Sequence, residues 1–224
     1  MPQERVLLGE SMIIRAKIEK GTLNIEGGSY LEVERLSFSY PKRVMGLSVL
    51  GKRVIQALRN VNLKIDEGDI VLITGSNGSG KTTLISALSG LIEPEGSIFL
   101  GGVKATPKVL REKCSAIFSE YLPFYGKLKV RDIVRLFSSI GYDLETLPYT
   151  DRYLHTLSHG ELARLSYNIW LGKPSEVYLG DEVGMELDDI NLEILYNSVK
   201  KKSDEGKIII LTSPFETNLF KKFG

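Results

Sequence analysis

The sequence predicts an α/β fold with a mostly parallel sheet covered by helices, together with an antiparallel β part and a small helical part. From residue 69 onward, strand patterns alternate with helical patterns, and this order is typical of parallel sheets. A glycine-rich turn joins the first of these strands to the first helix. The stretch before residue 69 contains mainly strand patterns, so we expect it to form a separate antiparallel layer.

Each expected element rests on a local pattern. Val130, Ile133, Val134, Phe137 and Ile140 recur at the spacing of one helix face. Other helices are expected at residues 81–89, 161–171 and 188–202, and strands at 12–18, 22–25, 31–38, 61–65, 69–74, 97–100, 115–118, 177–179 and 207–212. We place one domain over residues 1–224, with a β extension at 1–30, a core with its antiparallel layer at 31–120 and 157–224, and a short helical subdomain at 121–156.

The composition excludes several classes of function. The 224 residues include 29 Lys and Arg and 28 Asp and Glu, and the net charge of +1 gives no general attraction to nucleic acid. One cysteine rules out an internal disulfide framework, and two histidines rule out a histidine-rich metal site. No apolar run approaches the ~20 residues that span a bilayer, and the first ten residues lack the features of a secretory signal. We therefore expect any role at a membrane to depend on a partner protein.

Residues 75–82 fit the phosphate-binding pattern G-x-x-x-x-G-K-[ST], between an expected strand and an expected helix. Glycines let backbone N–H groups surround a phosphate, and the helix directs its positive end at the same anion. Lys81 can reach the terminal phosphates, and the Thr82 hydroxyl can bind Mg²⁺. The pattern predicts a P-loop nucleotide-binding core. We assign nucleotide binding to Gly75, Ser76, Asn77, Gly78, Ser79, Gly80, Lys81, Thr82 and Thr83.

An acidic pair follows the strand expected at residues 177–179. Asp181 ends this apolar run in the manner of a Walker B motif, which holds Mg²⁺. Glu182 comes next and can polarise an attacking water. Alone, such a pair also fits an ordinary solvated strand end. Together with the phosphate loop, it predicts a site for ATP hydrolysis.

With these motifs the chain resembles the ATP-binding cassette family, the nucleotide-binding subunits of ABC transporters. Leu157-Ser158-His159-Gly160-Glu161 is similar to the family signature LSGGQ, and Ser158 precedes Asp181 by 23 residues. Further similar segments, in the family's order, are Ser39-Tyr40-Pro41, residues 94–98, residues 130–133 and Leu187-Asp188. The resemblance extends over residues 31–215.

The resemblance implies a head-to-tail dimer, with ATP and Mg²⁺ between the Walker motifs of one cassette and the signature of a second cassette. It implies that Tyr40 stacks on adenine and that Thr82, Asp181 and Glu120 hold the metal. The catalytic positions that it implies are Glu182, which acts on the water, Ser213 and Glu120. The signature residues would contact the partner's nucleotide at a helix N-terminus, which attracts phosphate; they are Ser158, His159, Gly160 and Glu161. The implied function is the ATPase subunit of a transporter, cytoplasmic and held at the membrane by separate permease chains.

The chain departs from the family pattern at the switch histidine, which is expected soon after residue 212. Ser213 stands there, and no histidine follows His159. Serine keeps a hydroxyl but has a shorter reach and no imidazole. A positioned acid–base group is worth about 10²–10⁴ in rate. The sequence therefore predicts slow hydrolysis unless Ser213 suffices.

Other departures alter charge and shape near the nucleotide. Glu120 stands at the Q-loop glutamine, where a carboxylate can still bind Mg²⁺; if the loop centre lies one residue away, Glu120 is a surface charge. His159 replaces a signature glycine, and it either attracts phosphate when protonated or points to solvent. Glu161 replaces the signature glutamine, and Val183 replaces the proline that usually follows the catalytic glutamate.

Two other functions are consistent with the sequence. One is a non-transport cassette ATPase, although the chain has neither a long heptad insertion nor a second cassette. The other is a catalytically weak ATP-binding or regulatory subunit, which Ser213 and the altered signature motivate. The aromatic residues at 121–125 fit either a docking surface for a permease or packing within the helical subdomain. The second cassette can be another copy or a different chain, and no nucleic-acid partner is expected.

Overall fold

Two β-sheets form the framework of the protein. The computed structural model describes residues 3–8, 11–41, 54–118, 127–185 and 187–223. The first sheet has six strands in the order β1-β2-β6-β11-β10-β9, and the second has five in the order β3-β5-β4-β7-β8. This arrangement confirms the α/β fold with a mostly parallel sheet and an antiparallel layer that the sequence predicted.

The first sheet is parallel from β2 to β9, and β1 is antiparallel to β2. Along β11, Ile208 and Ile210 belong to the hydrophobic cluster on one face, and Ile209 and Leu211 belong to the cluster on the other face. Both faces are buried, which explains why these strands are continuous apolar runs. The strands are β1 (Glu4–Leu8), β2 (Ser11–Lys17), β6 (Ile70–Thr74), β9 (Cys114–Phe118), β10 (Val177–Asp181) and β11 (Ile208–Ser213).

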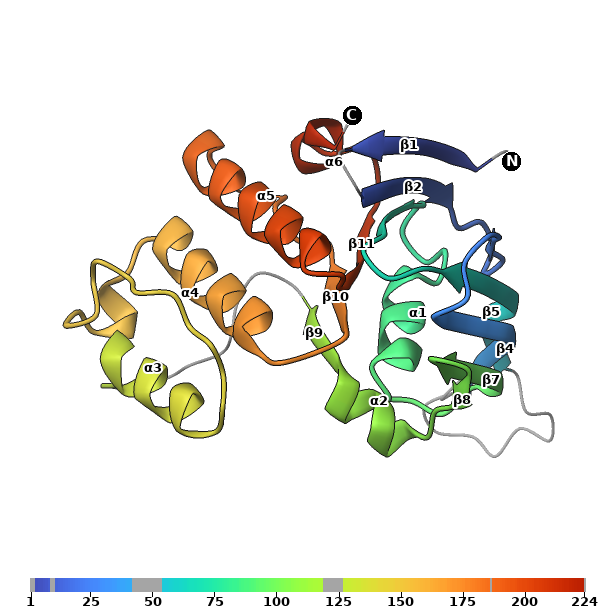
Figure 1. Cartoon of the computed structure of the whole chain (residues 1–224), viewed down its shortest axis with the longest axis horizontal. Coiled ribbons are helices and arrows are strands. Elements are labelled where there is room, and N and C mark those ends of the chain that lie inside the picture. The colour runs from blue at the N-terminus through green and yellow to red at the C-terminus, as the bar shows by residue number, and fades with distance from the viewer. Residues whose placement is uncertain (1–2, 9–10, 42–53, 119–126, 186, 224) are drawn as a thin grey trace, which may run out of the picture.

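The second sheet packs over α1 on one side of the first sheet (Figure 1). Its strand pairs are antiparallel except for β3 with β5. A long hairpin of β4 and β5 forms most of it. The strands are β3 (Asn24–Ile25), β4 (Leu31–Pro41), β5 (Val54–Ile65), β7 (Glu95–Leu100) and β8 (Val103–Lys104).

Helices cover both faces of the first sheet (Figure 1). Helix α1 (Lys81–Leu88) lies on the face shared with the second sheet, whereas α4 (His159–Gly172) and α5 (Asp189–Asp204) cover the opposite face. Helices α2 (Pro107–Lys113) and α6 (Asn218–Lys222) were not expected from the sequence. Their threonine N-caps, Thr106 and Thr217, are the local signals that could have revealed them.

The N-terminal strands occupy an unexpected place. We expected the early strands to join the antiparallel layer, but β2 lies in the first sheet, parallel to β6. Ile13 and Ile14 are adjacent in sequence and both 0% exposed, each in the cluster on a different face. Two neighbouring buried residues are typical of a strand covered on both sides, which is why β2 pairs with the core rather than with the outer layer.

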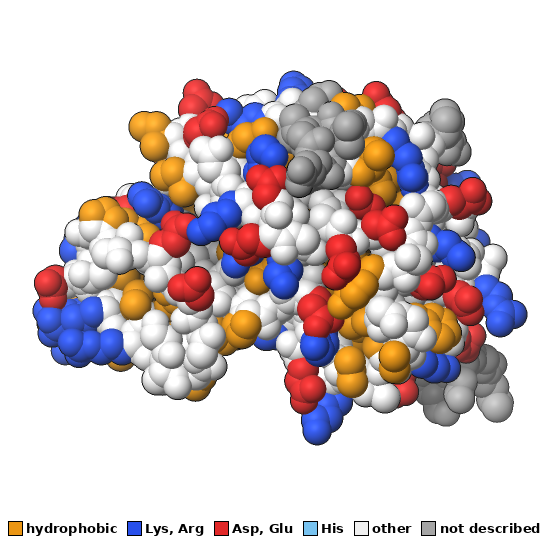
Figure 2. Space-filling model, viewed as in Figure 1, with side chains coloured by type: hydrophobic (Ala, Val, Ile, Leu, Met, Phe, Trp, Pro, Cys, Tyr) orange, Lys and Arg blue, Asp and Glu red, His pale blue; other side chains and the backbone are white. Residues whose placement is uncertain are grey.

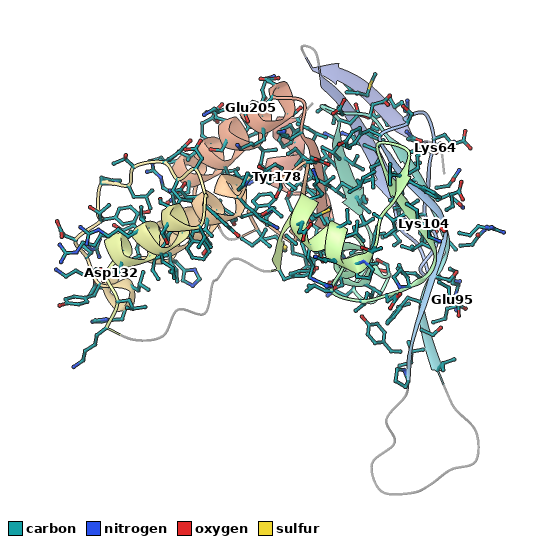
Figure 3. All side chains as sticks on the ribbon, turned by 60° about the horizontal axis from the view of Figure 1, so that its bottom comes forward. Lys64, Glu95, Lys104, Asp132, Tyr178 and Glu205 are labelled. Carbon is teal, nitrogen blue, oxygen red and sulfur yellow. The ribbon has the colours of Figure 1, made fainter. Side chains whose placement is uncertain are left out.

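A small helical part extends away from the sheets. Helix α3 (Val130–Ser139) packs through Val130 and Ile133 against Leu165 and Ile169 of α4. Figure 3 shows Asp132 of α3 and Lys104 of β8 at opposite ends of the molecule. The domain boundaries given above stay a prediction.

The visible surface carries mixed charge. Figure 2 shows basic and acidic side chains interspersed over one face, with small apolar areas between them. Among the residues that the structure describes, no helix is both long enough and apolar enough to cross a bilayer.

Candidate functional site

The phosphate loop lies between β6 and α1, as the sequence predicted. Gly78 and Gly80 have φ values of +78° and +107°, a region that other residues rarely adopt. A Cβ atom on Gly80 would lie 2.5 Å from the carbonyl oxygen of Ala57, so that position has no room for a side chain. A Cβ on Gly78 would meet nothing within 4 Å, so the loop is open on that side.

Lys81 points into this loop. It is only 4% exposed, and its Nζ donates hydrogen bonds to the carbonyl oxygens of Gly75 at 2.7 Å and Ser76 at 3.3 Å. The same nitrogen lies 3.7 Å from Oε1 of Glu182. The loop therefore holds a buried positive charge where an anion can meet it. The Ser79 hydroxyl is also buried here and has no hydrogen-bond partner within the described residues.

Asp181 is fixed by two threonines. The Thr82 hydroxyl donates to Oδ2 of Asp181 at 2.6 Å, and the buried Thr212 hydroxyl donates to Oδ1. Asp181 ends β10, Thr212 is the penultimate residue of β11, and Thr82 is the second residue of α1. Thr82 and Asp181 thus place two oxygen ligands together, as Mg²⁺ sites beside phosphates require. Within the described ranges there is no group of three or more His, Cys, Asp and Glu residues that could hold a metal.

Glu182 has a strained backbone. Its φ is +57°, in the left-handed region that costs an ordinary residue about 1–2 kcal/mol. Its N–H donates to the Thr212 carbonyl oxygen at 3.0 Å, which helps to hold this conformation. The carboxyl group is directed toward Lys81 rather than into the core, because their charged atoms are only 3.7 Å apart.

Ser213 lies directly beneath the loop. Its carbonyl oxygen accepts the N–H of Gly75 at 3.1 Å, and its side chain is 1% exposed. The hydroxyl accepts a hydrogen bond from the N–H of Phe215 at 3.4 Å. Ser213 is therefore close to the phosphate loop through its backbone, while its short side chain is bound to the following turn.

Tyr40 lies beside the start of α1. Its hydroxyl is 3.4 Å from Oγ1 of Thr83, and its ring meets Phe38 edge to face at 4.9 Å. The side chain is 41% exposed, so one side of the ring is available to a planar ligand. The structure thus brings Tyr40 close to the phosphate loop, from which it is 35 or more residues away in sequence.

The signature residues start α4, and they do not join the loop of their own chain. Helices α4 and α1 lie on opposite faces of the first sheet (Figure 1). Ser158 is the N-cap: its hydroxyl accepts the Glu161 N–H, and the Glu161 carboxylate accepts the Ser158 N–H at 2.8 Å. This bond from Ser158, with help from Arg152 at 2.6 Å, keeps the pKa of Glu161 below its usual value. His159 is exposed in the first turn.

Gly160 lies where an added side chain would press on the side chain of Asn191. A Cβ there would lie 2.6 Å from Nδ2 of Asn191 in α5. Asn191 is in turn bonded to Asp188, the N-cap of α5, at 2.8 Å through its N–H. The start of α4 therefore packs tightly against the start of α5.

The N-terminal segment 18–21 braces the phosphate loop, which sequence analysis missed. The Ile18 N–H donates to the Thr74 carbonyl oxygen at 2.8 Å, and the Gly21 N–H donates to that of Ser79 at 2.9 Å. A Cβ on Gly75 would lie 2.6 Å from the Ile18 carbonyl oxygen. The segment thus contacts the loop near both of its ends. A Lys20-Gly21 turn was the only local signal.

Some of the expected site residues lie outside the description. Glu120, assigned to catalysis and to the metal, and the aromatic residues at 121–125 fall in the range 119–126, which the structure does not describe. Thr212 was also not singled out from the sequence, because a threonine inside an apolar strand carries no motif.

Known proteins are similar to this chain in sequence and fold. The model of the ABC transporter family matches residues 58–184, more than half of the chain. A putative ABC transporter ATP-binding protein of Methanocaldococcus jannaschii is 31% identical over 183 residues, covering 70% of this chain and 65% of that protein. The energy-coupling factor transporter ATP-binding protein of Bacillus licheniformis is 29% identical over 181 residues, covering 72% and 64%.

A solved structure is also similar. An ATP-binding cassette, determined as a dimer in a post-hydrolysis state with ADP and Pi, has a TM-score of 0.63 and 22% identity. The similarity covers 85% of this chain and 90% of that one. At this identity the likeness supports the fold alone.

The fold and the loop define a P-loop protein with a parallel core sheet. With the family match over residues 58–184, this chain belongs to the ABC transporter family. It spans 65% and 64% of the length of the two relatives named above.

The bracing contact of Gly21 can be tested directly. A Cβ there would lie 2.4 Å from the Ala57 carbonyl oxygen, and φ is +80°, so Gly21→Ala should displace the segment from the loop. We expect hydrogen–deuterium exchange over residues 75–81 to be about tenfold faster, because local opening becomes easier. Gly206→Ala is the control, since its φ is +79° and its Cβ would meet nothing within 4 Å. Equal exchange in the two variants would contradict the bracing role.

Proposed function

We propose that this chain binds ATP with Mg²⁺ and hydrolyses it, as the ATP-binding subunit of a transporter whose permease is a separate protein. The observation that carries this proposal is the 2.6 Å hydrogen bond between Thr82 and Asp181, which are 99 positions apart. It joins the end of the phosphate loop to the acid at the end of β10, which is separated from β6 in the sheet by β11. A phosphate loop, a metal-binding acid and an adjacent glutamate are the parts that ATP hydrolysis requires.

The residues present fit both ATP and Mg²⁺. Thr82 and Asp181 offer the hydroxyl and carboxylate oxygens that Mg²⁺ binds beside phosphates. Bound there, the metal would offset the negative charge of the phosphates. The loop is open at Gly78 and contains the buried Lys81, and both features suit a phosphate group. The exposed ring of Tyr40 suits the adenine base.

Lys81 and Glu182 also interact in a way that ATP binding should alter. Their charged atoms are 3.7 Å apart. A phosphate in the loop would compete for Lys81 and leave the Glu182 carboxylate available to orient and polarise a water. We therefore assign Glu182 as the catalytic carboxylate and Ser213 as the residue at the switch position. Glu120 keeps its proposed place as a further metal ligand.

A dimer would complete the site. Ser158, His159, Gly160 and Glu161 lie at the start of α4, on the face of the sheet opposite α1, and we infer that they serve the nucleotide of a second cassette. The start of a 14-residue helix is suited to phosphate. The related cassette with ADP and Pi is dimeric, which supports this arrangement. The second cassette can be another copy or a different chain.

A transport role is supported by the relatives. The Bacillus licheniformis relative is named as part of an energy-coupling factor transporter. We infer that a permease holds this chain at the cytoplasmic face of a membrane. A non-transport cassette ATPase is the competing interpretation. A membrane-spanning partner protein would distinguish the transport role from it.

A weak ATPase is the second candidate function, because Ser213 stands at the switch position. Its hydroxyl is bound to the N–H of Phe215 and its side chain is buried. A serine so held has less reach toward a water than an imidazole. We infer that hydrolysis by this chain is slow.

Glu182→Gln should separate binding from hydrolysis. The amide keeps the shape but loses the charge that polarises water, so we expect ATP affinity within about threefold of wild type and turnover at least 100-fold lower. Fluorescent-ATP binding and phosphate release measure the two. Glu205→Gln is the control, because Glu205 pairs with Lys202 at the far end of α5 (Figure 3). A Glu182→Gln variant with wild-type turnover would exclude the assignment.

Ser213→His tests the cause of the slow turnover. If the missing imidazole limits the rate, we expect kcat to rise by about tenfold or more with little change in the KM for ATP. Ser213→Ala should lower kcat or leave it unchanged, which controls for loss of the hydroxyl. A lower kcat in a correctly folded Ser213→His variant would place the limit elsewhere.

Purification from native membranes tests the transport role. A tagged chain should copurify with a protein that has several membrane spans, because the proposed subunit acts through a permease. The readout is mass spectrometry of the detergent-solubilised complex, with an untagged strain as the control. Recovery of the chain without any such partner would favour the non-transport interpretation.

A further inference from the structure

A tyrosine of α4 holds the turn that follows Glu182. The hydroxyl of Tyr167 accepts a hydrogen bond from the N–H of Gly184 at 3.1 Å. The bond is buried, and Tyr167 is 5% exposed. Gly184 is only two residues beyond Glu182, so this contact lies next to the proposed catalytic carboxylate.

This turn needs an external constraint. Glu182 and Gly184 have φ values of +57° and +77°, both in the left-handed region. Val183 stands where the resemblance to the family leads us to expect proline, a residue that fixes its own φ. Val183 instead packs beside Gly180: a Cβ on Gly180 would lie only 3.0 Å from the Val183 side chain. The Tyr167 hydroxyl restrains the turn further, through its hydrogen bond with the N–H of Gly184.

Three contacts together determine the backbone of residues 182–184. The N–H of Glu182 is bonded to the Thr212 carbonyl oxygen, the side chain of Val183 is buried in the core, and the N–H of Gly184 is bonded to Tyr167. Without the Tyr167 hydroxyl, the buried N–H of Gly184 loses its hydrogen-bond partner. An unpaired buried donor is unfavourable, so the turn would rearrange to satisfy it. The Glu182 side chain moves with that backbone.

Tyr167 also lies on the helix that begins with the signature. Ser158, the N-cap, and Tyr167 are nine positions apart, which is ~13 Å along a helix. The start of α4 is fixed against α5 by the close approach of Gly160 to Asn191. One continuous helix thus links the face proposed for the partner's nucleotide to the turn after Glu182 in the same chain.

We propose that Tyr167 is a positioning residue for Glu182, and that α4 transmits the state of the partner's nucleotide to this chain's own Glu182. The transmission through α4 rests on the dimer proposed above. The positioning role of Tyr167 rests only on contacts within one chain. The two nucleotide sites of a dimer would then be coupled through two copies of α4.

Tyr167→Phe tests this with the loss of one oxygen atom. In the full chain we expect kcat to fall about tenfold while the KM for ATP stays within twofold, because the phosphate loop is untouched. In a Glu182→Gln background the same change should have no further effect on turnover, since Tyr167 acts through Glu182. An additive loss in the double variant would overturn the positioning role.

Tyr178→Phe is the matched control. Tyr178, near the start of β10, is also buried, and its hydroxyl donates to the Lys173 carbonyl oxygen at 2.6 Å rather than to the turn after Glu182. We expect a similar fall in Tm but an unchanged kcat. Equal falls in kcat for both tyrosine variants would show a general loss of stability and would overturn the proposal.

Hydrogen exchange separates this proposal from the proposed ATPase function. In Tyr167→Phe, but not in Tyr178→Phe, exchange at the Gly184 amide should be at least tenfold faster, whether or not the chain hydrolyses ATP. With a nonhydrolysable ATP analogue, this amide should gain protection in the wild type and much less in Tyr167→Phe. Wild-type exchange at Gly184 in Tyr167→Phe would overturn the assignment, whereas absence of Glu182-dependent turnover would count only against the ATPase function.

Discussion

The site depends on the meeting of parallel strands at one edge of the first sheet. Because β6, β10 and β11 run in the same direction, their carboxyl ends bring together the phosphate loop, Asp181 and Ser213. The Thr82–Asp181 hydrogen bond closes this arrangement across 99 positions of sequence. The other parts of the site also lie at this edge: Lys81 follows β6 at the start of α1, and Glu182 directly follows β10.

The phosphate loop is held from both sides of its strand. On one side, the Ser213 carbonyl oxygen accepts the N–H of Gly75; on the other, Ile18 and Gly21 bond to Thr74 and Ser79. A loop rich in glycine is conformationally free, and binding an anion with it would cost that freedom if the fold did not restrain it first. The segment that follows β2 therefore contributes to the site by restraining the loop.

The altered signature is locally consistent with its helix. Glu161 closes a capping box with Ser158 and forms an ion pair with Arg152. A glutamine could form the capping box, but it has no charge for the ion pair. The same helix carries Tyr167 against the turn after Glu182. Substitutions that looked like isolated departures in sequence, Glu161 and Val183, thus have partners in the fold. Ser213 is different, because its contacts keep it in place without supplying an imidazole.

The sequence alone determined the main elements, the phosphate loop, the acidic pair and the family resemblance, because these follow from local periodicity and from short motifs. It could not place β2 in the first sheet, since strand patterning does not say which strand is the neighbour. Nor could it find Thr212, Gly21 and Tyr167, which belong to no motif and act through contacts between distant segments. Those contacts exist only once β2, β6, β10 and β11 pair and α4 packs across them, so the tertiary structure alone decided how the site is held.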